Sequence, residues 1–236
     1  MKRAPAAGQE AESLVDPVAA AITELVLDGT YGPGDRLKLS DLAARLGLSV
    51  TPIREALWKL EGSGLVQNHP NRGAVVRVID AAHIRNVYDV RGALDAMLVE
   101  KAMDCVTSAQ LATIDDARRA YEAAVERDDP RSILAADLAF HESIRRITGN
   151  DVAMEVMRSS FQLIATFRLR LGFDADRTRE VIDEHAEIVE AIRRGDRAAA
   201  AQRMRQHANG ARASLERAGS ERQATAELQG RRKRRT

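Results

Sequence analysis

Three histidines and one aspartate occupy positions where a helix normally buries apolar side chains. Asp137 and His141 lie four residues apart in the segment 131–148, whose apolar residues recur every three or four positions. His185 and His207 hold the same kind of position in the segments 175–194 and 196–217. Burying a polar side chain is costly unless it is paired. The four residues, called the Asp/His cluster below, therefore need a partner inside the protein.

The last two of these segments meet at a turn, Gly195-Asp196. His185 lies ten residues before Gly195 and His207 eleven after Asp196, which at about 1.5 Å per residue is roughly 15–17 Å from the turn. An antiparallel hairpin brings both histidines to one level, where the rest of the cluster can join them. Imidazole and carboxylate together suit a divalent transition metal such as Zn²⁺, Ni²⁺ or Mn²⁺. The sequence predicts a metal site; the alternative is three separately satisfied core histidines.

A small carboxylate is the expected occupant of the coordination positions that four protein ligands leave open. Arg91 lies on the apolar stripe of the segment 81–104, and a guanidinium can hold a carboxylate by two parallel hydrogen bonds. The alternative for Arg91 is an ion pair with Asp95, one helical turn away. Arg168 and Asn150 are further candidates for effector binding.

A metal-dependent hydrolase is the competing class, because such a site with open positions can activate water. The sequence shows no separate general base or nucleophile arrangement beside the cluster. The HExxH pattern of zinc proteases is also absent, since Arg145 stands where the second histidine would follow His141-Glu142. We therefore predict that the chain is not an enzyme. A metal sensor, in which the ion itself is the signal, stays open as an alternative.

The composition favours helices that pack around an aliphatic core. Hydrophobic residues make up 44% of the 236 residues but aromatic ones only 3%, so the core must rest on Ala, Leu, Ile and Val. A net charge of +1 provides no global basic field, so DNA binding requires a local motif. Cys105 is the one cysteine, which excludes an internal disulfide and fits a reducing compartment. No apolar run reaches signal-peptide or membrane-spanning length, so we expect a soluble cytoplasmic protein with no membrane partner.

Residues 80–217 carry the pattern of an all-α domain. Cap-and-stop signals such as Asp129-Pro130 and Gly149-Asn150-Asp151 divide the region into short-linked helices. We expect an antiparallel six-helix bundle. Its helices are predicted at 81–104, 109–127, 131–148, 151–171, 175–194 and 196–217.

Residues 14–78 carry the pattern of a winged helix-turn-helix, so the fold class is mainly α. A helix from Asp16-Pro17 precedes two short helices around a Gly47 turn, and a hairpin signal follows in LVQNHPNRGAVVRV. The outer segments 1–13 and 218–236, the second ending in a basic run, are expected to be disordered tails.

The second helix of such a motif enters the major groove of double-stranded DNA by its N-terminus. Ser49, Thr51 and Arg54 lie there and can reach phosphates or base edges. Arg36 and Arg45 suit backbone contacts, and the wing tip, Arg72-Gly73, suits a minor groove. A homodimer would place one such helix in each half of a palindromic operator.

The run GDRLKLSDLAARLGLSVTPIREALWKLEGSGLVQNHPNRGAVV resembles the DNA-binding domain of the GntR family of bacterial transcription regulators. The resemblance implies that Arg36, Arg45, Thr51, Arg54 and Gly73 contact the operator. Val50 departs from the family pattern, in which many members carry a base-reading arginine, so the family's operator preference does not carry over to this position.

The segments DLAFHESIRRITGN, DEHAEIVEAIRRGD and AQRMRQHANG are similar to the FCD ligand-binding domain of the FadR subfamily, and six helices point to its VanR-like branch. The resemblance implies that Asp137, His141, His185 and His207 hold a metal and that small organic acids are effectors. The predicted function is a transcriptional repressor whose operator affinity responds to an acid bound at this metal.

Overall fold

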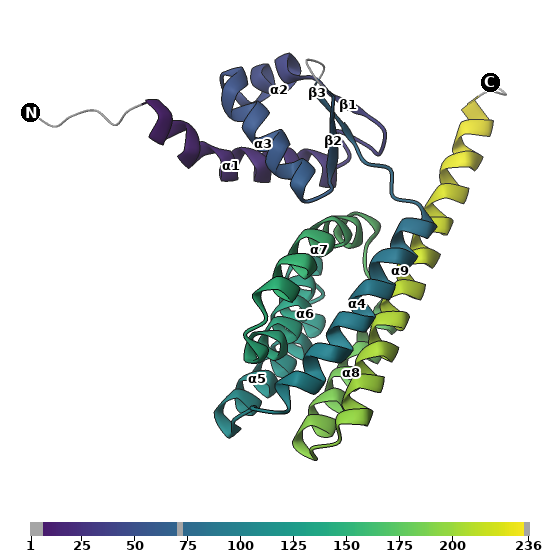
Figure 1. Ribbon diagram of the computed structural model, residues 1–236. Helices are drawn as coiled ribbons and strands as arrows, with labels where there is room; N and C mark the ends of the chain where they lie inside the picture. The colour runs from purple at the N-terminus through teal and green to yellow at the C-terminus, as the bar shows by residue number, and fades with distance from the viewer. Residues whose placement is uncertain (1–6, 70–72, 234–236) are drawn as a thin grey trace, which may run out of the picture. The chain divides into compact units, whose positions relative to one another are not determined.

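The structure is a computed structural model that describes residues 7–69 and 73–233 (Figure 1). The chain forms two compact units. One is built from the residues up to Ile79 together with Arg158–Arg170, and the other from Asp80–Met157 and the residues from Leu171 onward. No helix within the described ranges is long and apolar enough to cross a membrane.

The first unit is a winged helix-turn-helix, as the sequence predicts. Its elements in chain order are α1 (Ala7–Leu27), β1 (Arg36–Leu37), α2 (Leu39–Leu46), α3 (Val50–Gly62), β2 (Val66–His69) and β3 (Gly73–Val76). The antiparallel sheet has the order β1-β3-β2, with Leu37 opposite Ala74 and Val66 opposite Val76. The hairpin prediction is confirmed, whereas β1 is too short to leave a pattern in the sequence.

Apolar side chains spaced at helical intervals join α1, α2 and α3 into the core of this unit. Ile22, Leu42 and Ile53, one from each helix, are fully buried there. The turn between α2 and α3 depends on Gly47, whose φ of +67° lies in the left-handed region that favours glycine. This core holds α3, the second helix of the helix-turn-helix, in a fixed relation to the strands of the wing.

The chain from Asp80 onward is all-α, and the six predicted helices are confirmed within one to three residues except at the end of the last. These helices are α4 (Ala81–Ala102), α5 (Ser108–Glu126), α6 (Pro130–Arg145), α7 (Asp151–Leu171), α8 (Ala175–Arg193) and α9 (Arg197–Lys233). The Arg158–Arg170 part of α7 groups with the first unit. A short 3-10 turn, Arg146–Thr148, follows α6. Local chemistry sets the starts: Asp80, Asp129 and Asp174 cap their helices, and Thr107 with Gln110 forms a capping box.

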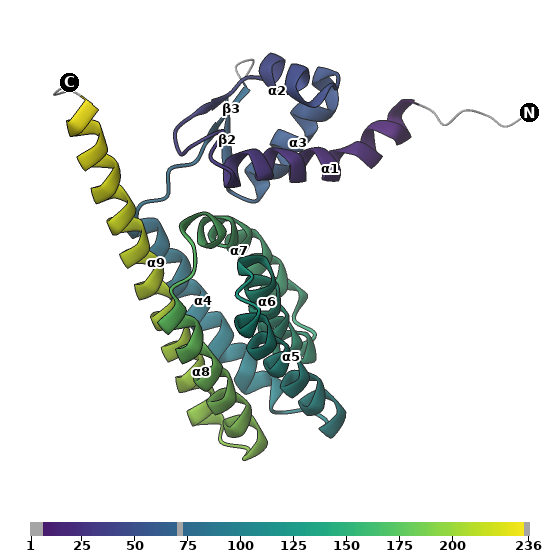
Figure 2. The ribbon, with the colours of Figure 1, turned by 180° about the vertical axis from the view of Figure 1, so that it is seen from behind.

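Figures 1 and 2 show α4 lying alongside α9, and α8 also packs against α9. The close approach of α4 to α9 uses Gly92, where an added Cβ would lie 3.4 Å from the Cβ of Ala208. Because α6, α8 and α9 all face the same interior, they bring together the four members of the Asp/His cluster.

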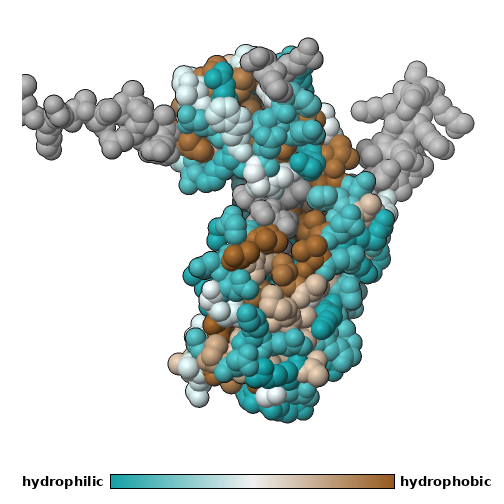
Figure 3. Space-filling model, viewed as in Figure 1, coloured by the Kyte–Doolittle hydropathy of each residue, from teal (hydrophilic) through white to brown (hydrophobic). Residues whose placement is uncertain are grey.

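One face of α4 leaves apolar side chains at the surface. Val90 is 48% exposed, and Val87, Leu94 and Met97 are half-buried. The four positions follow each other at steps of three and four residues, so they share one stripe of the helix. Hydrophobic residues gather on the face of the second unit where Figure 1 places α4 (Figure 3). This α4 stripe is an apolar surface of the kind that often marks a protein interface.

The ends of the chain differ from the sequence prediction. The first helix begins at Ala7 rather than at Asp16, and Pro17 lies inside it. The last helix continues to Lys233, so residues 218–233 are helical rather than disordered. Alanine, glutamine, glutamate and arginine in these stretches are good helix formers, which outweighs the single backbone hydrogen bond that Pro17 removes. The predictions for residues 1–6 and 234–236 lie outside the described residues.

Candidate functional site

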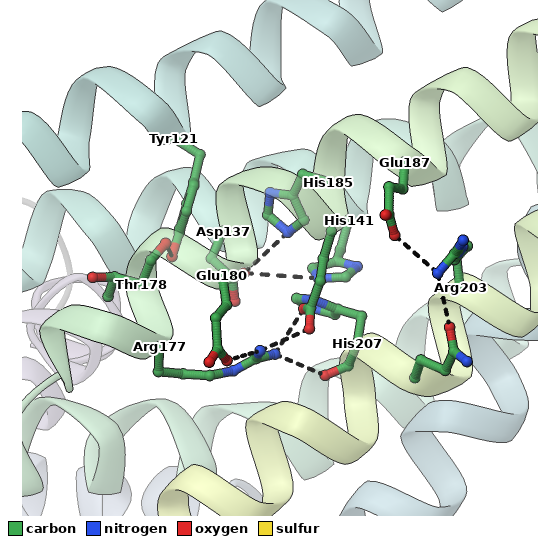
Figure 4. Close-up of polar contacts among 12 residues, drawn as sticks. Tyr121, Asp137, His141, Arg177, Thr178, Glu180, His185, Glu187, Arg203 and His207 are labelled. Carbon is green, nitrogen blue, oxygen red and sulfur yellow. Dashed lines mark hydrogen bonds and ion pairs between the residues drawn. The ribbon is translucent and has the colours of Figure 1, made fainter.

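The Asp/His cluster converges inside the second unit. Asp137 and His141 come from α6, His185 from α8 and His207 from α9, and all four are buried. One ligand atom from each lies within 4.8 Å of the others (Figure 4). The structure therefore confirms the prediction that these four side chains come together.

The ring nitrogens of the cluster are poorly satisfied by protein groups. Among the described residues, neither nitrogen of His185 has a hydrogen-bond partner, and Nδ1 of His141 has none. Asp137 Oδ1 lies 3.6 Å from His185 Nε2 and 3.8 Å from His141 Nε2, beyond hydrogen-bond length. Phe140 stacks on the His185 ring with a centroid separation of 3.9 Å and fixes its plane. Buried polar atoms left without partners fit a metal ion as the missing partner.

The protonation states suit metal binding. Burial lowers the pKa of His141 well below its usual range, and the positive charge of Arg91 adds to the effect. Burial likewise lowers the pKa of His185, with His207 contributing in the same direction. Both imidazoles are therefore neutral at pH 7 and have a lone pair to offer. Neutral imidazole is the form that ligates metals.

Two arginines share one carboxylate near the cluster. Arg145 donates to both oxygens of Asp95 at 2.6 and 2.9 Å, and Arg91 Nε donates to Asp95 at 3.3 Å. All three residues are buried. The ion pair between Arg91 and Asp95, which the sequence offered as the alternative role of Arg91, is therefore present. Burial lowers the pKa of Arg91, while Asp95, Tyr88 and Asp137 counteract it. Arg91 therefore lies within electrostatic range of the cluster, and its effector role stays a prediction.

The other two effector candidates are placed differently. Asn150 caps α7, because its Oδ1 accepts a hydrogen bond from the backbone N–H of Ala153 at 3.1 Å. Arg168 lies on α7 in the stretch that groups with the first unit, whereas the cluster belongs to the second. A structural task thus accounts for Asn150, and the effector role of both residues stays a prediction.

Sequence reasoning missed three residues that surround His207. Glu184 accepts a hydrogen bond from His207 Nδ1 at 2.7 Å, and Arg177 binds Glu184 from the same helix (Figure 4). Gly210 of α9 lies against the guanidinium of Arg177. In the sequence, the sign of this contact is the acidic residue directly before His185. Its role depends on the approach of α8 to α9, which the sequence does not show.

Five of the DNA-binding candidates lie on the surface of the first unit, whereas Gly73 is buried. Arg36, Arg45, Ser49, Thr51 and Arg54 are all exposed. Ser49 precedes α3 without making a side-chain cap hydrogen bond, which leaves its hydroxyl available to DNA. Arg72 lies outside the described residues.

The exposed stripe of α3 contains one residue that the sequence interpretation overlooked. Thr51, Arg54 and Trp58 follow each other at steps of three and four residues, and Trp58 is 59% exposed. Arg54 and Trp58 also line a groove with Asn68 and His69 of the wing. Trp58 thus extends the stripe from the N-terminus of α3 towards the wing.

The wing is tied to the first unit by close backbone contacts. Gly73 has a φ of +83°, and an added Cβ there would lie 2.1 Å from the carbonyl oxygen of Leu37. Glu61 of α3 accepts hydrogen bonds from the backbone and the side chain of Asn68, both at 2.8 Å, which lowers the pKa of Glu61. Gly73 therefore has a structural reason to be glycine, besides the predicted approach to DNA.

Comparison with known proteins agrees with both units. Residues 14–76 match the family described as bacterial regulatory proteins, gntR family, and residues 86–210 match the FCD domain. The HTH-type transcriptional regulator YdhC of Bacillus subtilis strain 168 is 26% identical over 190 residues, which cover 80% of this chain and 84% of YdhC. The HTH-type transcriptional repressor RspR of Escherichia coli strain K12 is 27% identical over 176 residues, covering 74% and 77%.

A solved structure, Escherichia coli McbR/YncC, has the same fold, with a TM-score of 0.72 at 21% identity, covering 86% of this chain and 97% of its own. The FCD match alone spans more than half of the chain. The protein belongs to the GntR family of bacterial transcription regulators and combines a DNA-binding winged helix-turn-helix with an effector-binding FCD domain.

Proposed function

We propose that the protein is a repressor whose operator affinity is controlled by a small organic acid bound at a metal ion in the FCD domain. The observation that carries the proposal is the Asp/His cluster, whose buried nitrogens lack protein partners. Asp137, His141, His185 and His207 would hold a divalent ion such as Zn²⁺, Ni²⁺ or Mn²⁺. Such an ion, when bound, offers open coordination positions to a carboxylate.

The charges around the cluster favour an anionic effector. Two buried guanidiniums, from Arg91 and Arg145, contact the carboxylate of Asp95 near the cluster. The imidazoles of His141 and His185 are neutral. A divalent ion held by the cluster would add positive charge beside these guanidiniums, and positive charge attracts an anion. Arg91 is our first candidate for the effector's carboxylate; Asn150 and Arg168 are the other candidates.

The exposure of most candidate residues on the first unit supports the operator contacts that we propose. Ser49, Thr51 and Arg54 would lie in the major groove, since the N-terminus of a recognition helix enters it. Arg36 and Arg45 would bind the phosphate backbone, and Arg72 with Gly73 would reach the minor groove at the wing.

We further propose a homodimer formed through the α4 stripe. The residues of the α4 stripe are spaced symmetrically about the position of Gly92. A second copy of α4 running antiparallel would therefore place Val87 opposite Met97 and Val90 opposite Leu94. A two-fold interface requires such self-complementarity. Two winged units would then bind a palindromic operator.

The effector acts in this account by a population shift. The acid binds one relative arrangement of the two winged units more tightly than the other, and operator affinity changes by the same coupling free energy. RspR is named a repressor, which supports the same direction of control here. Because chromosomal DNA is the partner, we place the protein in the cytoplasm.

A hydrolase is the weaker alternative. Glu184 lies outside the cluster but contacts His207, and burial would raise the pKa of Glu184. Hydrogen bonds from His207 and Arg177 outweigh burial and lower the pKa of Glu184 to about 2. A general base works best with a pKa near the operating pH, so Glu184 is poorly suited to that task.

The test begins with selection of operator fragments from genomic DNA by the purified protein. Operator affinity is then titrated with the metal ion alone and with acids suggested by the adjacent genes. Control by an acid in the metal-loaded protein supports the proposal. Control by reversible metal binding alone would establish the metal sensor instead.

A further inference from the structure

His207 is oriented by a carboxylate outside the Asp/His cluster. Its Nδ1 lies 2.7 Å from Oε2 of Glu184, whose side chain is only 25% exposed. An ionised carboxylate accepts hydrogen bonds but donates none, so Nδ1 of His207 carries the hydrogen. In the neutral ring the lone pair is then on Nε2, the nitrogen that faces His141. Glu184 thus determines which atom of His207 points into the cluster.

Glu184 is itself clamped by Arg177. Arg177 Nη1 donates to Oε1 of Glu184 and Nη2 donates to Oε2, both at 2.7 Å. Nη2 also lies 3.4 Å from the carbonyl oxygen of His207. Arg177 is seven residues before Glu184 on α8, so two helical turns separate the partners. This bidentate pair fixes the plane of the carboxylate, and hence the direction in which it receives the His207 hydrogen.

A glycine in the middle of α9 makes room for the clamp. Gly210 is one turn after His207, and an added Cβ would lie 2.5 Å from Nη2 and 2.7 Å from Cζ of Arg177. Glycine inside a helix costs about 1 kcal/mol relative to alanine. The close approach of Arg177 gives a physical reason for glycine at this position.

We propose that Glu184, held by Arg177 against Gly210, is a positioning residue that fixes His207 as a metal ligand through Nε2. The inference rests on the metal site proposed above. A partner of this kind raises the basicity of a ligating imidazole and holds its orientation, and its loss typically weakens metal binding about 10–100-fold.

Glu180 offers a matched control on the same helix. It accepts a hydrogen bond from the same Arg177 at 2.9 Å, but its side chain is 65% exposed. Glu180→Gln therefore removes the same charge from Arg177 and leaves the Glu184–His207 hydrogen bond intact. Both substitutions remove one negative charge from α8. A difference in Zn²⁺ affinity between Glu180→Gln and Glu184→Gln therefore arises from the contact between Glu184 and His207.

The experiment measures the Zn²⁺ affinity of the full-length, metal-stripped protein by competition with a chelator. Nitrogen-15 NMR of the metal-free imidazoles serves as a second readout. We expect Glu184→Gln to weaken Zn²⁺ binding about 10–100-fold. The same variant should populate both tautomers of His207, whereas Glu180→Gln should match the wild type in both readouts.

Gly210→Ala provides an independent variant, because it displaces Arg177 without touching either acid or histidine. We expect it to weaken Zn²⁺ binding as well, in protein whose circular dichroism confirms an intact fold. Equal Zn²⁺ affinity and an unchanged His207 tautomer in Glu184→Gln and Gly210→Ala would overturn the positioning role. Wild-type protein that binds no Zn²⁺, Ni²⁺ or Mn²⁺ would instead overturn the metal site itself.

Discussion

The Nε2 atoms of His141 and His207 lie 3.0 Å apart in the interior of the second unit. Two facing lone pairs repel each other, so a hydrogen between the nitrogens suits this short distance. His207 already carries its hydrogen on Nδ1, towards Glu184. With that tautomer of His207, the hydrogen in the gap comes from His141, and a cation bound by both rings would take its place.

Removal of one cluster histidine should abolish metal binding. His185→Ala deletes the ring whose two nitrogens lack hydrogen-bond partners within the described residues. We expect metal content after dialysis to fall below about a tenth of the wild-type value, since loss of one of four ligands strongly weakens a site. His69→Ala, on the exposed wing strand β2, is the matched control. Full metal occupancy in His185→Ala would argue against the four-ligand site.

Operator binding should depend on the exposed stripe of α3. Arg54→Ala removes a guanidinium from each recognition helix, and such a contact contributes about 1–3 kcal/mol. We expect operator affinity to fall at least about tenfold while metal binding is unchanged. Lys59→Ala on the same helix is the control, because Lys59 pairs with Asp16 of α1. Trp58 is the only tryptophan of the chain, so its emission reports DNA binding directly. Equal operator affinity in Arg54→Ala would contradict the assignment of this face.

A charge on the α4 stripe should separate the dimer. Val90→Asp places a carboxylate in the proposed apolar interface, where burial without a partner is costly. We expect light scattering to give a monomer for Val90→Asp and a dimer for the wild type. Val152→Asp on α7 makes the same substitution at a valine that is 76% exposed and should leave the dimer intact. A dimeric Val90→Asp protein would locate the interface elsewhere.

The metal-free protein should lose stability as the pH falls. Burial holds the pKa of His141 and His185 well below the usual 6.5, so the native protein keeps both rings neutral. The unfolded chain takes up these protons below about pH 6.5. It then binds more protons than the native state, and the free energy of unfolding decreases by up to about 1.4 kcal/mol per group and pH unit.

Urea unfolding of stripped protein at pH 7.5 and pH 5.5 measures this decrease. His185→Phe, which keeps a ring against Phe140, should show a shallower dependence. A free energy of unfolding that is the same at both pH values would contradict the neutral, buried state of the two rings.

The bundle helices and the level of two cluster histidines could be predicted from the sequence, because they depend on local patterns. Apolar periodicity and cap residues predict the bundle helices, and equal distances from the Gly195 turn place His185 and His207 at one level. The first and last helices exceed their predicted lengths. Neither Pro17 nor the polar composition after Arg217 ends a helix made of good helix formers.

Contacts between distant segments could not be predicted in this way. Arg145 binds Asp95, fifty positions earlier in the chain, and nothing local to either residue indicates the pair. The role of Gly210 depends on the distance between α9 and the Arg177 side chain of α8. Gly73 is similar, since the nearby backbone of β1 accounts for its lack of a side chain.

The most direct test of the account is the operator affinity of the metal-loaded protein with and without each candidate acid, measured in parallel for His185→Ala. The account predicts that one acid changes the wild-type affinity at least about fivefold, the lower range of allosteric coupling, and leaves His185→Ala unaffected. An equal response of both proteins to that acid would place the effector away from the Asp/His cluster and contradict the central claim.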